Sequence, residues 1–394
     1  MYAGSTARSF EQASGDLAIE AELTITAERI RRATEGIGDE RVTQRRQAVE
    51  AWQSLPLPLQ RQSRQSHIPT VACIQTDGGR LQVRLDEDAG EGAAGEPPSD
   101  PRRRFWRESK VACLLRMTSE VYDHDPCPDL PATFANIARV AQLSREIKGF
   151  SPLRTEPEEA APAAREEAET VRAGRPQLLT RHVLAMRAAV EEFGAHVAVA
   201  AWEGGFFQAE RKAFVADGQA SNWTIWRRYF SDFTAILDFV HAVCYVFQAA
   251  AAGRALDDVA DVYRGWAQLL WSGRTTELIA AVEARLAELG PPLPSDGETH
   301  PRSIVQNVLG YLRNQAARMN YSEYRRRGLP ITSAYVESTI KQINRRVKGT
   351  EKFWGSEGAQ TLLQLSADYL SDRTPLDQFW RDRPAQATGL RTPI

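Results

Sequence analysis

Residues 328–346, GLPITSAYVESTIKQINRR, place one carboxylate, Glu337, in a helical stretch that is rich in basic residues. A structural interpretation is an ion pair between Glu337 and Lys341, one helical turn later. The alternative is that Glu337 holds a metal ion while the basic residues hold a polyanion. Two aspartates offer the same chemistry, Asp77 in an Asp-Gly-Gly stretch and Asp217 at the end of a short apolar run.

Three carboxylates that converge at one edge of a sheet would repel one another and would need a cation. Hard oxygen ligands favour Mg²⁺ or Mn²⁺. Two such ions can stabilise both the attacking and the leaving oxygen of a phosphoryl transfer. Each acid also has a structural explanation, which is turn chemistry for Asp77, a helix cap for Asp217 and an ion pair for Glu337. Sequence spacing does not show that the three meet, so both interpretations stay open.

The N-terminal region that would accompany this site has helical periodicity over residues 9–60, with Thr26 as the expected N-cap of its second helix. A helix, a short turn and a helix bearing Arg29, Arg31 and Arg32 fit a helix-turn-helix. They fit an ordinary helical hairpin equally well.

The elements that must position the acids alternate between strand and helix. Residues 69–85 predict a β-hairpin that turns at Asp-Gly-Gly, and residues 104–117 predict a third strand of the same meander. Residues 177–203 read as helix, and residues 212–218 as a strand that ends in Asp217. A mixed sheet with helices on its faces, α/β or α+β, is the expected fold class.

The remaining pattern is mostly helical. A helix is expected from Ser221, and the following strand turns into a helix near Asp238. Helices with breaks fill residues 255–320. The last two helices are the one that carries Glu337 and the one at residues 357–370.

Composition sets the expected compartment and charge. The 394-residue chain has a net charge of −2, no apolar run of membrane-spanning length and no secretory leader pattern, so we expect a cytoplasmic protein that does not contact membranes. Its four cysteines have no zinc-site spacing. Residues 301–354 hold 11 Lys and Arg against 3 Asp and Glu, and acidic stretches at 86–100 and 155–170 offset this charge. A local basic field of this kind suits a phosphate backbone.

Four stretches of the chain resemble one protein family. GLPITSAYVESTIKQINRRVKGTEKFW with GAQTLLQLSADYLSD is similar to the C-terminal catalytic block of bacterial insertion-sequence transposases of the DDE type, closest to the ISKra-like group that is allied to mutator-like elements. TVACIQTDGGRLQVR with FWRESKVACLL resembles their first catalytic strands, and FVADGQASNWTIWRRYFSDFTAILDFVHAV their second. SFEQASGDL with ITAERIRRATEGIGDE resembles their upstream helical segment. The resemblance covers roughly residues 9–382.

The resemblance implies an RNase H-like core in which Asp77, Asp217 and Glu337 are the catalytic acids and hold two Mg²⁺ or Mn²⁺ ions. It implies a helical insertion before the glutamate. It also matches the family's C/DxxH motif to Asp238 and His241, for which a buried pair that fixes the strand–helix junction is the structural alternative. Two departures are the missing cysteine-rich N-terminal segment and ITSAYVES, where many relatives have two more glycines.

On this basis the chain is expected to be a DNA transposase that cuts and joins double-stranded DNA at element ends and target, as a homo-oligomer associated with the bacterial nucleoid. Alternatives are an inactive DNA-binding remnant and an RNase H-like metal-dependent nuclease. The run 325–327 is expected either to contact phosphate or to be a solvated surface. The expected regions are 1–66 (helical, with a helix-turn-helix as one interpretation), 67–254 (first part of the catalytic domain), 255–320 (insertion), 321–382 (C-terminal part of the catalytic domain, with the glutamate helix) and 383–394 (tail). The expected phosphate contacts are Lys341, Arg345, Arg346, Lys348 and Lys352.

Overall fold

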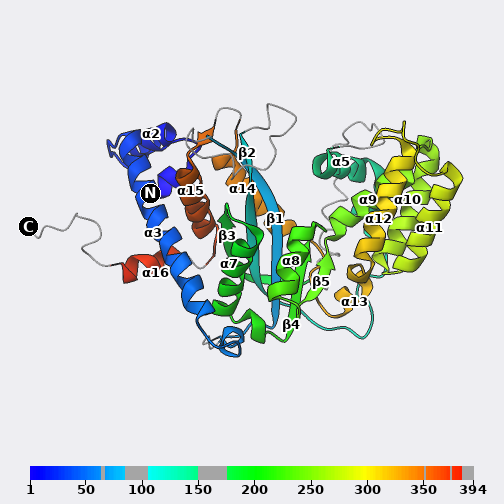
Figure 1. Ribbon diagram of the computed structural model, residues 1–394, viewed down its shortest axis with the longest axis horizontal. Coiled ribbons are helices and arrows are strands. Elements are labelled where there is room, and N and C mark those ends of the chain that lie inside the picture. The colour runs from blue at the N-terminus through cyan, green and yellow to red at the C-terminus, as the bar shows by residue number, and fades with distance from the viewer. Residues whose placement is uncertain (64–66, 85–104, 150–174, 350–351, 373–374, 384–394) are drawn as a thin grey trace, which may run out of the picture.

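A mixed, open β-sheet flanked by helices forms the centre of the protein (Figure 1), which confirms the expected mixed α/β class. The computed structural model describes residues 1–63, 67–84, 105–149, 175–349, 352–372 and 375–383. Both acidic stretches of the sequence, 86–100 and 155–170, lie outside the described residues. None of the helices in these ranges is both long and apolar enough to cross a membrane.

The sheet has the order β3-β2-β1-β4-β5, and the short β6 pairs with β1 at its far end. β1 runs antiparallel to β2 and β2 antiparallel to β3, whereas β4 and β5 continue the sheet parallel to β1. Helices cover both faces, so the central strands are buried on both sides and read as apolar runs such as 71–74 and 213–216. The strand bounds are β1 (Val71–Val83), β2 (Trp106–Thr118), β3 (Gln177–Met186), β4 (Arg211–Ala216), β5 (Thr234–Leu237) and β6 (Phe353–Trp354).

The expected hairpin at Asp-Gly-Gly is wrong. β1 passes straight through Asp77, Gly78 and Gly79 and stays in register with β2 along its length. The glycines allow close packing, because a Cβ on Gly79 would lie 2.8 Å from the Ser109 hydroxyl. The meander of the structure is therefore β1-β2-β3, and Asp77 lies in the middle of a strand.

The helix expected at residues 177–186 is also wrong, because this segment is the edge strand β3. Tertiary contacts explain the difference, since β3 is paired with β2 along one edge and capped along the other. The Val183 N–H donates to the Ser371 hydroxyl and the Arg181 N–H to the Asp372 carboxylate, while the Asp372 N–H donates to the Arg181 carbonyl. These contacts cover an edge that would otherwise be open.

Two pairs of helices cover the sheet on opposite faces. α7 and α8 lie on the face that carries Phe214, whose ring contacts Trp223 of α8. α14 and α15 pack on the other face, the one that carries Gln75 and Cys113. The helix bounds are α1 (Tyr2–Thr6), α2 (Phe10–Glu20), α3 (Ala27–Gln53), α4 (Ala132–Ala135), α5 (Ile137–Lys148), α7 (Val190–Glu203), α8 (Ala220–Tyr229), α9 (Phe239–Ala251), α10 (Leu256–Trp271), α11 (Thr275–Leu289), α12 (Pro301–Gln315), α13 (Tyr321–Arg326), α14 (Ala334–Val347), α15 (Ser356–Tyr369) and α16 (Pro375–Asp382), with 3-10 turns η1 (Leu59–Arg61), η4 (Phe206–Gln208) and η5 (Ala316–Arg318).

The N-terminal helices are an integral layer of the fold. Thr26 caps α3 as expected, since its hydroxyl accepts the N–H of Arg29. α3 then lies along α15 (Figure 1), where the buried guanidinium of Arg41 donates to both oxygens of the fully buried Asp368, at 2.9 and 3.1 Å. Burial of one partner without the other would be costly, so this ion pair fixes the packing of the two helices.

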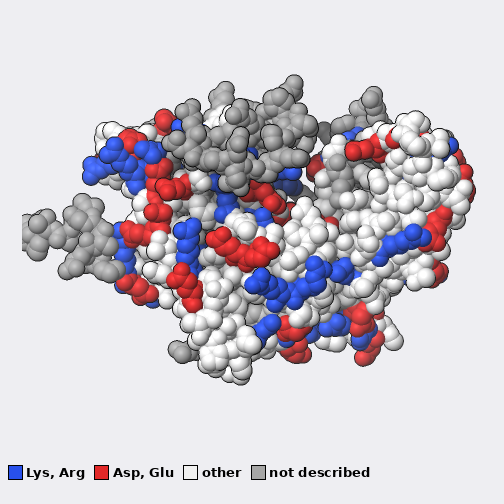
Figure 2. Space-filling model, in the orientation of Figure 1, with Lys and Arg blue, Asp and Glu red and all other residues white. Residues whose placement is uncertain are grey.

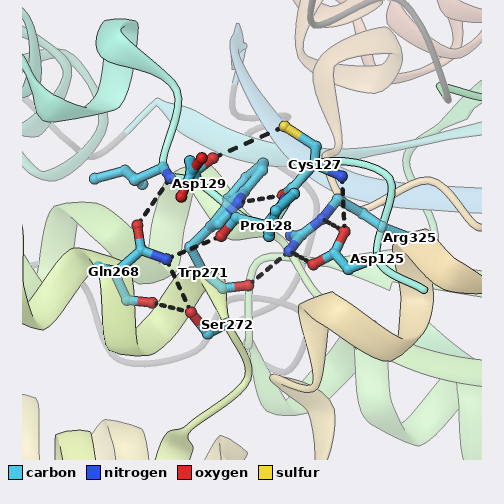
Figure 3. Close-up of polar contacts among 9 residues, drawn as sticks. Asp125, Cys127, Pro128, Asp129, Gln268, Trp271, Ser272 and Arg325 are labelled. Carbon is cyan, nitrogen blue, oxygen red and sulfur yellow. Dashed lines mark hydrogen bonds and ion pairs between the residues drawn. The ribbon is translucent and has the colours of Figure 1, made fainter.

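Helices α9 to α12 and α13 form a second lobe beyond β5 (Figure 1). Figure 3 shows how the loop after β2 is fastened to it. Arg325 pairs with Asp125, stacks on the ring of Trp271 at 3.9 Å and donates to its carbonyl, while Gln268 donates to the carbonyl of Pro128. Arg325 is buried, so at this position the phosphate-contact interpretation of run 325–327 is wrong.

Candidate active site

Three aspartates lie side by side across the parallel half of the sheet. Thr76 of β1 is paired with Ala216 of β4, and Ala216 with Leu237 of β5. The residue after each of these is an aspartate, so Asp77, Asp217 and Asp238 follow one another on neighbouring strands, which are about 4.8 Å apart. The carboxyl ends of β4 and β5 meet the middle of the longer β1 here, at the kind of sheet edge where ligands bind in open α/β folds.

The carboxyl of Asp77 has a pKa that is raised by its surroundings. Burial and then the charge of Asp217 raise the pKa of its carboxyl to about 7, and the charge of Glu337 adds to them. The Gly78 N–H, which donates to Asp77 at 2.6 Å, and the nearby His241 act in the opposite direction. Asp217 and Glu337, far apart in sequence, are thus both close enough to Asp77 to disfavour its charge.

Glu337 comes from the first turn of α14, and β1 holds that turn directly. Gln75 is buried; its side-chain oxygen accepts the Val336 N–H at 3.1 Å and its amide donates to the Thr332 carbonyl at 2.9 Å. Gln75 and Asp77 are two residues apart on one strand and so face the same side of the sheet. Asp77 and Glu337 therefore share the face that α14 covers.

Asp238 and His241 form a buried hydrogen-bonded pair at the start of α9. One oxygen of Asp238 accepts both the backbone N–H and the ring Nδ1–H of His241, each at 2.7 Å, and its other oxygen accepts the Ser333 N–H at 2.7 Å. Burial alone would raise the pKa of Asp238, but these hydrogen bonds and the charge of His241 lower it. The Ser333 hydroxyl in turn donates to Glu337 at 2.9 Å.

Asp238 thus connects the strand edge to the glutamate helix through Ser333. Both of its oxygens accept buried hydrogen bonds, from His241 at the start of α9 and from Ser333, so the pair fixes the strand–helix junction. One ligand atom each from Asp238, His241 and Glu337 lies within 4.8 Å of the others, which is a spacing that a metal ion can bridge. Asp77 and Asp217 are not members of that group.

The Asp238–His241–Glu337 group fits a single ion less well than the distances suggest. Asp238 and His241 use their facing atoms for the hydrogen bond between them, so they do not both point at one cation. An imidazole whose Nδ1–H binds a carboxylate presents its Nε2 to a ligand, and Asp238 would then orient His241 from behind. The carboxylates of Asp77, Asp217 and Glu337 match the oxygen preference of Mg²⁺ better than a histidine does.

The second aspartate is held by two sets of donors. One oxygen of Asp217 accepts the Gln219 N–H at 3.0 Å and the Asn222 amide at 2.9 Å, both from the start of α8. Helix α12 binds the backbone of the same turn, because the Tyr311 hydroxyl donates to the Asp217 carbonyl at 3.0 Å and Gln315 donates to the Gly218 carbonyl at 3.2 Å.

Gly218 is required at this turn. Its φ of +98° is one that a residue with a side chain rarely adopts, and a Cβ there would lie 2.9 Å from the Tyr311 ring. The ring of Tyr311 also stacks on that of Tyr245 from α9, with centroids 3.8 Å apart. Helix α12 therefore helps to hold the Asp217–Gly218 turn in place, together with α8.

The predicted phosphate contacts divide into exposed and buried residues. Lys341 and Arg345 are exposed on α14 and Lys348 at its C-cap. Among the described residues no ion pair joins Lys341 to Glu337. Lys352 donates its ammonium to the Arg345 and Arg346 carbonyls at the end of this helix.

Arg346 has a different environment from the rest of this set. It is buried, donates to the Gly4 and Arg8 carbonyls, and lies against the rings of Phe10 and Trp354. It fastens the N-terminal segment to α14, so a phosphate-contact role for Arg346 does not fit this geometry.

Several residues that build the site escaped the sequence analysis. They are neutral side chains whose partners lie far away in the chain, so their types alone gave no signal. A glycine directly after Asp217 was the one available hint of an unusual turn. The residues missed are Gln75, Ser333, Tyr311, Gln315 and Asn222.

Comparison with known proteins adds no assignment to this geometry. No protein-family model matches the chain, and no curated protein sequence matches it either.

Proposed function

We propose that the chain is a DDE-type DNA transposase whose site is formed by Asp77, Asp217 and Glu337. The observation that carries the proposal is the convergence of charge at Asp77, where burial, then the charge of Asp217 and, to a smaller extent, that of Glu337 raise the pKa to about 7. Asp217 directly follows the β4 residue that pairs with Thr76 of β1, and Glu337 comes from α14. Carboxylates that disfavour one another's charged form when no cation is bound are expected at a site that binds a metal ion.

The order of the sheet supports the same proposal. Three antiparallel strands followed by two parallel ones, with the first strand in the centre, is the arrangement expected of an RNase H-like core. The first acid on the central strand, the second after its parallel neighbour and the glutamate on a late helix agree with the family that the sequence resembles. Helices α10 to α12 occupy the place of its insertion.

In this proposal the three carboxylates hold Mg²⁺ or Mn²⁺, two ions in all. Bound there, the ions would supply charge stabilisation to the phosphorane-like transition state. Asp238 and Ser333 orient Glu337, while α8 and α12 orient Asp217. The charge of His241 acts on Asp77, and the hydrogen bond of its Nδ1 to Asp238 holds the ring in one orientation.

The reaction has two steps of the same kind. A water oxygen bonds to phosphorus and the bond from phosphorus to the 3′ oxygen breaks. One water proton passes to the 3′ oxygen and the other to solvent, which leaves a 3′-hydroxyl and a 5′-phosphate. The oxygen of the new 3′-hydroxyl then bonds to a phosphorus of target DNA and loses its proton, while the displaced 3′ oxygen of the target takes up a proton. Lys341, Arg345 and Lys348 are exposed and follow Glu337 at intervals of about one helical turn. We propose that they contact the phosphates, with Lys352 beyond the helix end.

The test is Mg²⁺-dependent cleavage of a plasmid that carries the DNA flanking the gene. We expect wild-type protein to nick at the element ends and Asp217→Asn to lose that activity by about 10²-fold or more, since it removes a charged ligand. Equal cleavage by both proteins would refute the site. Asp261→Asn, an exposed aspartate of α10, is the matched control.

A metal-dependent nuclease is the second candidate, and the same row of acids supports it. Labelled, pre-cut end DNA incubated with a target plasmid separates the two functions. Joined products indicate strand transfer, whereas cleavage without joined products indicates a nuclease. Protein that binds DNA but neither cuts nor joins it would be the inactive remnant.

A further inference from the structure

Three arginines gather outside the acidic row, on the surface formed by α8 and η5. Arg227 and Arg228 are exposed in the last turn of α8, and Arg318 ends η5, directly after α12. Arg318 reaches across to α8, where its guanidinium lies 4.4 Å from the ring centre of Trp223 and 5.8 Å from that of Trp226. Figure 2 shows Lys and Arg side chains gathered over the region of α8.

This basic surface, defined by Arg227, Arg228 and Arg318, has no acidic partner within the described part of the chain. Arg227 donates to the Thr224 hydroxyl, and Arg318 to the Asn314 carbonyl and the Gln315 side-chain oxygen. Many other arginines of the protein are matched with carboxylates, as Arg274 is with Glu277. Uncompensated like charges cost free energy unless an anion offsets them.

The electrostatics of Arg318 show that these charges interact. Burial lowers the pKa of its guanidinium, and the charge of Arg227 lowers it further. The two Trp rings hold the guanidinium in place, so little conformational entropy remains to be lost when a ligand binds.

The surface is connected to the second acid by named contacts. Arg318 donates to Gln315 at 3.1 Å, and Gln315 donates to the Gly218 carbonyl next to Asp217. From that turn α8 runs for 10 residues, about 15 Å, to Arg227 and Arg228. Because duplex DNA carries one charge per about 1.7 Å of axis, a surface of this length faces several phosphates.

We propose that Arg227, Arg228 and Arg318 bind the phosphate backbone of the DNA flank that extends away from the acidic row. The inference rests on the proposed function, because it concerns the DNA that the same site would cut. Guanidinium groups suit phosphate oxygens, which they bind through two parallel hydrogen bonds. Contacts of this type fix the path of the duplex and read no sequence.

The experiment measures binding without cleavage. Fluorescence anisotropy of a labelled random-sequence duplex is recorded in EDTA over a range of salt concentrations. For Arg227→Gln/Arg228→Gln we expect weaker binding at low salt and a slope of log K against log salt smaller by about 2, since each phosphate contact contributes about 0.9. Arg228→Glu alone should weaken binding further than Arg228→Gln.

The matched control is Arg264→Gln/Arg274→Gln, which removes the same charge from exposed arginines of α10 and the start of α11. This control should keep the wild-type slope, and melting curves check that both doubles are folded. An unchanged slope in Arg227→Gln/Arg228→Gln, or an equal fall in the control, would overturn the basic surface while leaving the proposed function to the cleavage test. If Arg227→Gln/Arg228→Gln loses binding to poly-glutamate but keeps binding to DNA, the proposed DNA contact is overturned as well. The basic surface is then assigned to an acidic protein.

Failure of the proposed function has its own readout. If Asp217→Asn cuts as well as wild type while the salt slopes behave as expected, the surface binds DNA but the metal site is wrong. Wild-type protein that shows no salt-dependent binding to duplex DNA would overturn both.

Discussion

Replacement of Asp77 by Asn should stabilise the metal-free protein above neutral pH. The substitution keeps the size of the side chain and an oxygen that accepts the Gly78 N–H, and it removes a charge that burial and Asp217 disfavour. A pKa raised from 3.8 to about 7 corresponds to about 4 kcal/mol, because one pKa unit is worth about 1.4 kcal/mol. Solvent that screens the charge of Asp77 would reduce this free energy, so we take about 4 kcal/mol as the upper limit.

The sign of the pH dependence follows from proton linkage. An acid whose pKa is raised in the folded state binds its proton more tightly when folded, so its contribution to stability is present below about pH 4 and is lost as the pH rises through about 7. Wild-type protein in EDTA should therefore lose up to about 4 kcal/mol across this window. With an unfolding entropy near 0.8 kcal/mol per kelvin for 394 residues, the Tm changes by about 5 °C.

The assay is thermal unfolding followed by circular dichroism at pH 5 and pH 8, with EDTA or Mg²⁺. Wild type should be less stable than Asp77→Asn at pH 8 in EDTA, and Mg²⁺ should restore it by mass action. Asp77→Asn should respond less to pH and to Mg²⁺ over the same range, and Asp261→Asn should behave as wild type does. If Asp77→Asn is no more stable than wild type at pH 8, the charge repulsion at this site is refuted.

Of three further predictions, two concern the supports of the site and one concerns the buried ion pair between α3 and α15. Tyr311→Phe removes the donor to the Asp217 carbonyl, so we expect stability to fall by about 1 kcal/mol in melting experiments. Metal titration should show a higher Mg²⁺ concentration for half-maximal cleavage. An unchanged metal requirement would argue against the role of α12. Asp238→Ala leaves the Ser333 and His241 N–H groups without their acceptor. We expect chemical denaturation to show a loss of about 2–4 kcal/mol of stability, and cleavage assays to show the loss of most activity. Near-wild-type cleavage would contradict the role of Asp238. Arg41→Leu leaves the buried Asp368 without its ion-pair partner and should lower stability by about 3–5 kcal/mol in urea unfolding. The control Arg32→Leu, at an exposed ion pair, should lower stability less. Similar losses in both variants would contradict the importance of the buried pair.

The elements that sequence periodicity found are those with local signals. β4, β5 and the start of α9 were correct because short apolar runs end in a residue that caps the next element, as Asp238 does. The Asp-Gly-Gly stretch and residues 177–186 were misassigned because long-range contacts decide them. Glycines at 78 and 79 serve close packing against β2, and pairing with β2 makes residues 177–186 a strand.

For the site, the types of the acids were informative and their surroundings were not. The register that aligns Asp77 with Asp217 depends on pairing between segments about 140 residues apart, which no local pattern encodes. Arg325 and Arg346 occur in basic runs that look exposed, yet each is buried against aromatic rings. Charge patterning identifies a basic region, but tertiary packing determines which of its members remain accessible.

The hold of α12 on the Asp217–Gly218 turn has a consequence for dissecting the protein. A shortened chain that deletes residues 255–320 and joins α9 to α13 would keep every strand of the sheet and all three proposed acids. It would nevertheless leave two carbonyl groups of that turn without the Tyr311 and Gln315 donors and would open one side of Gly218. We expect such a shortened chain to retain the sheet and to lose the placement of Asp217, so α12 is a structural support of the proposed site.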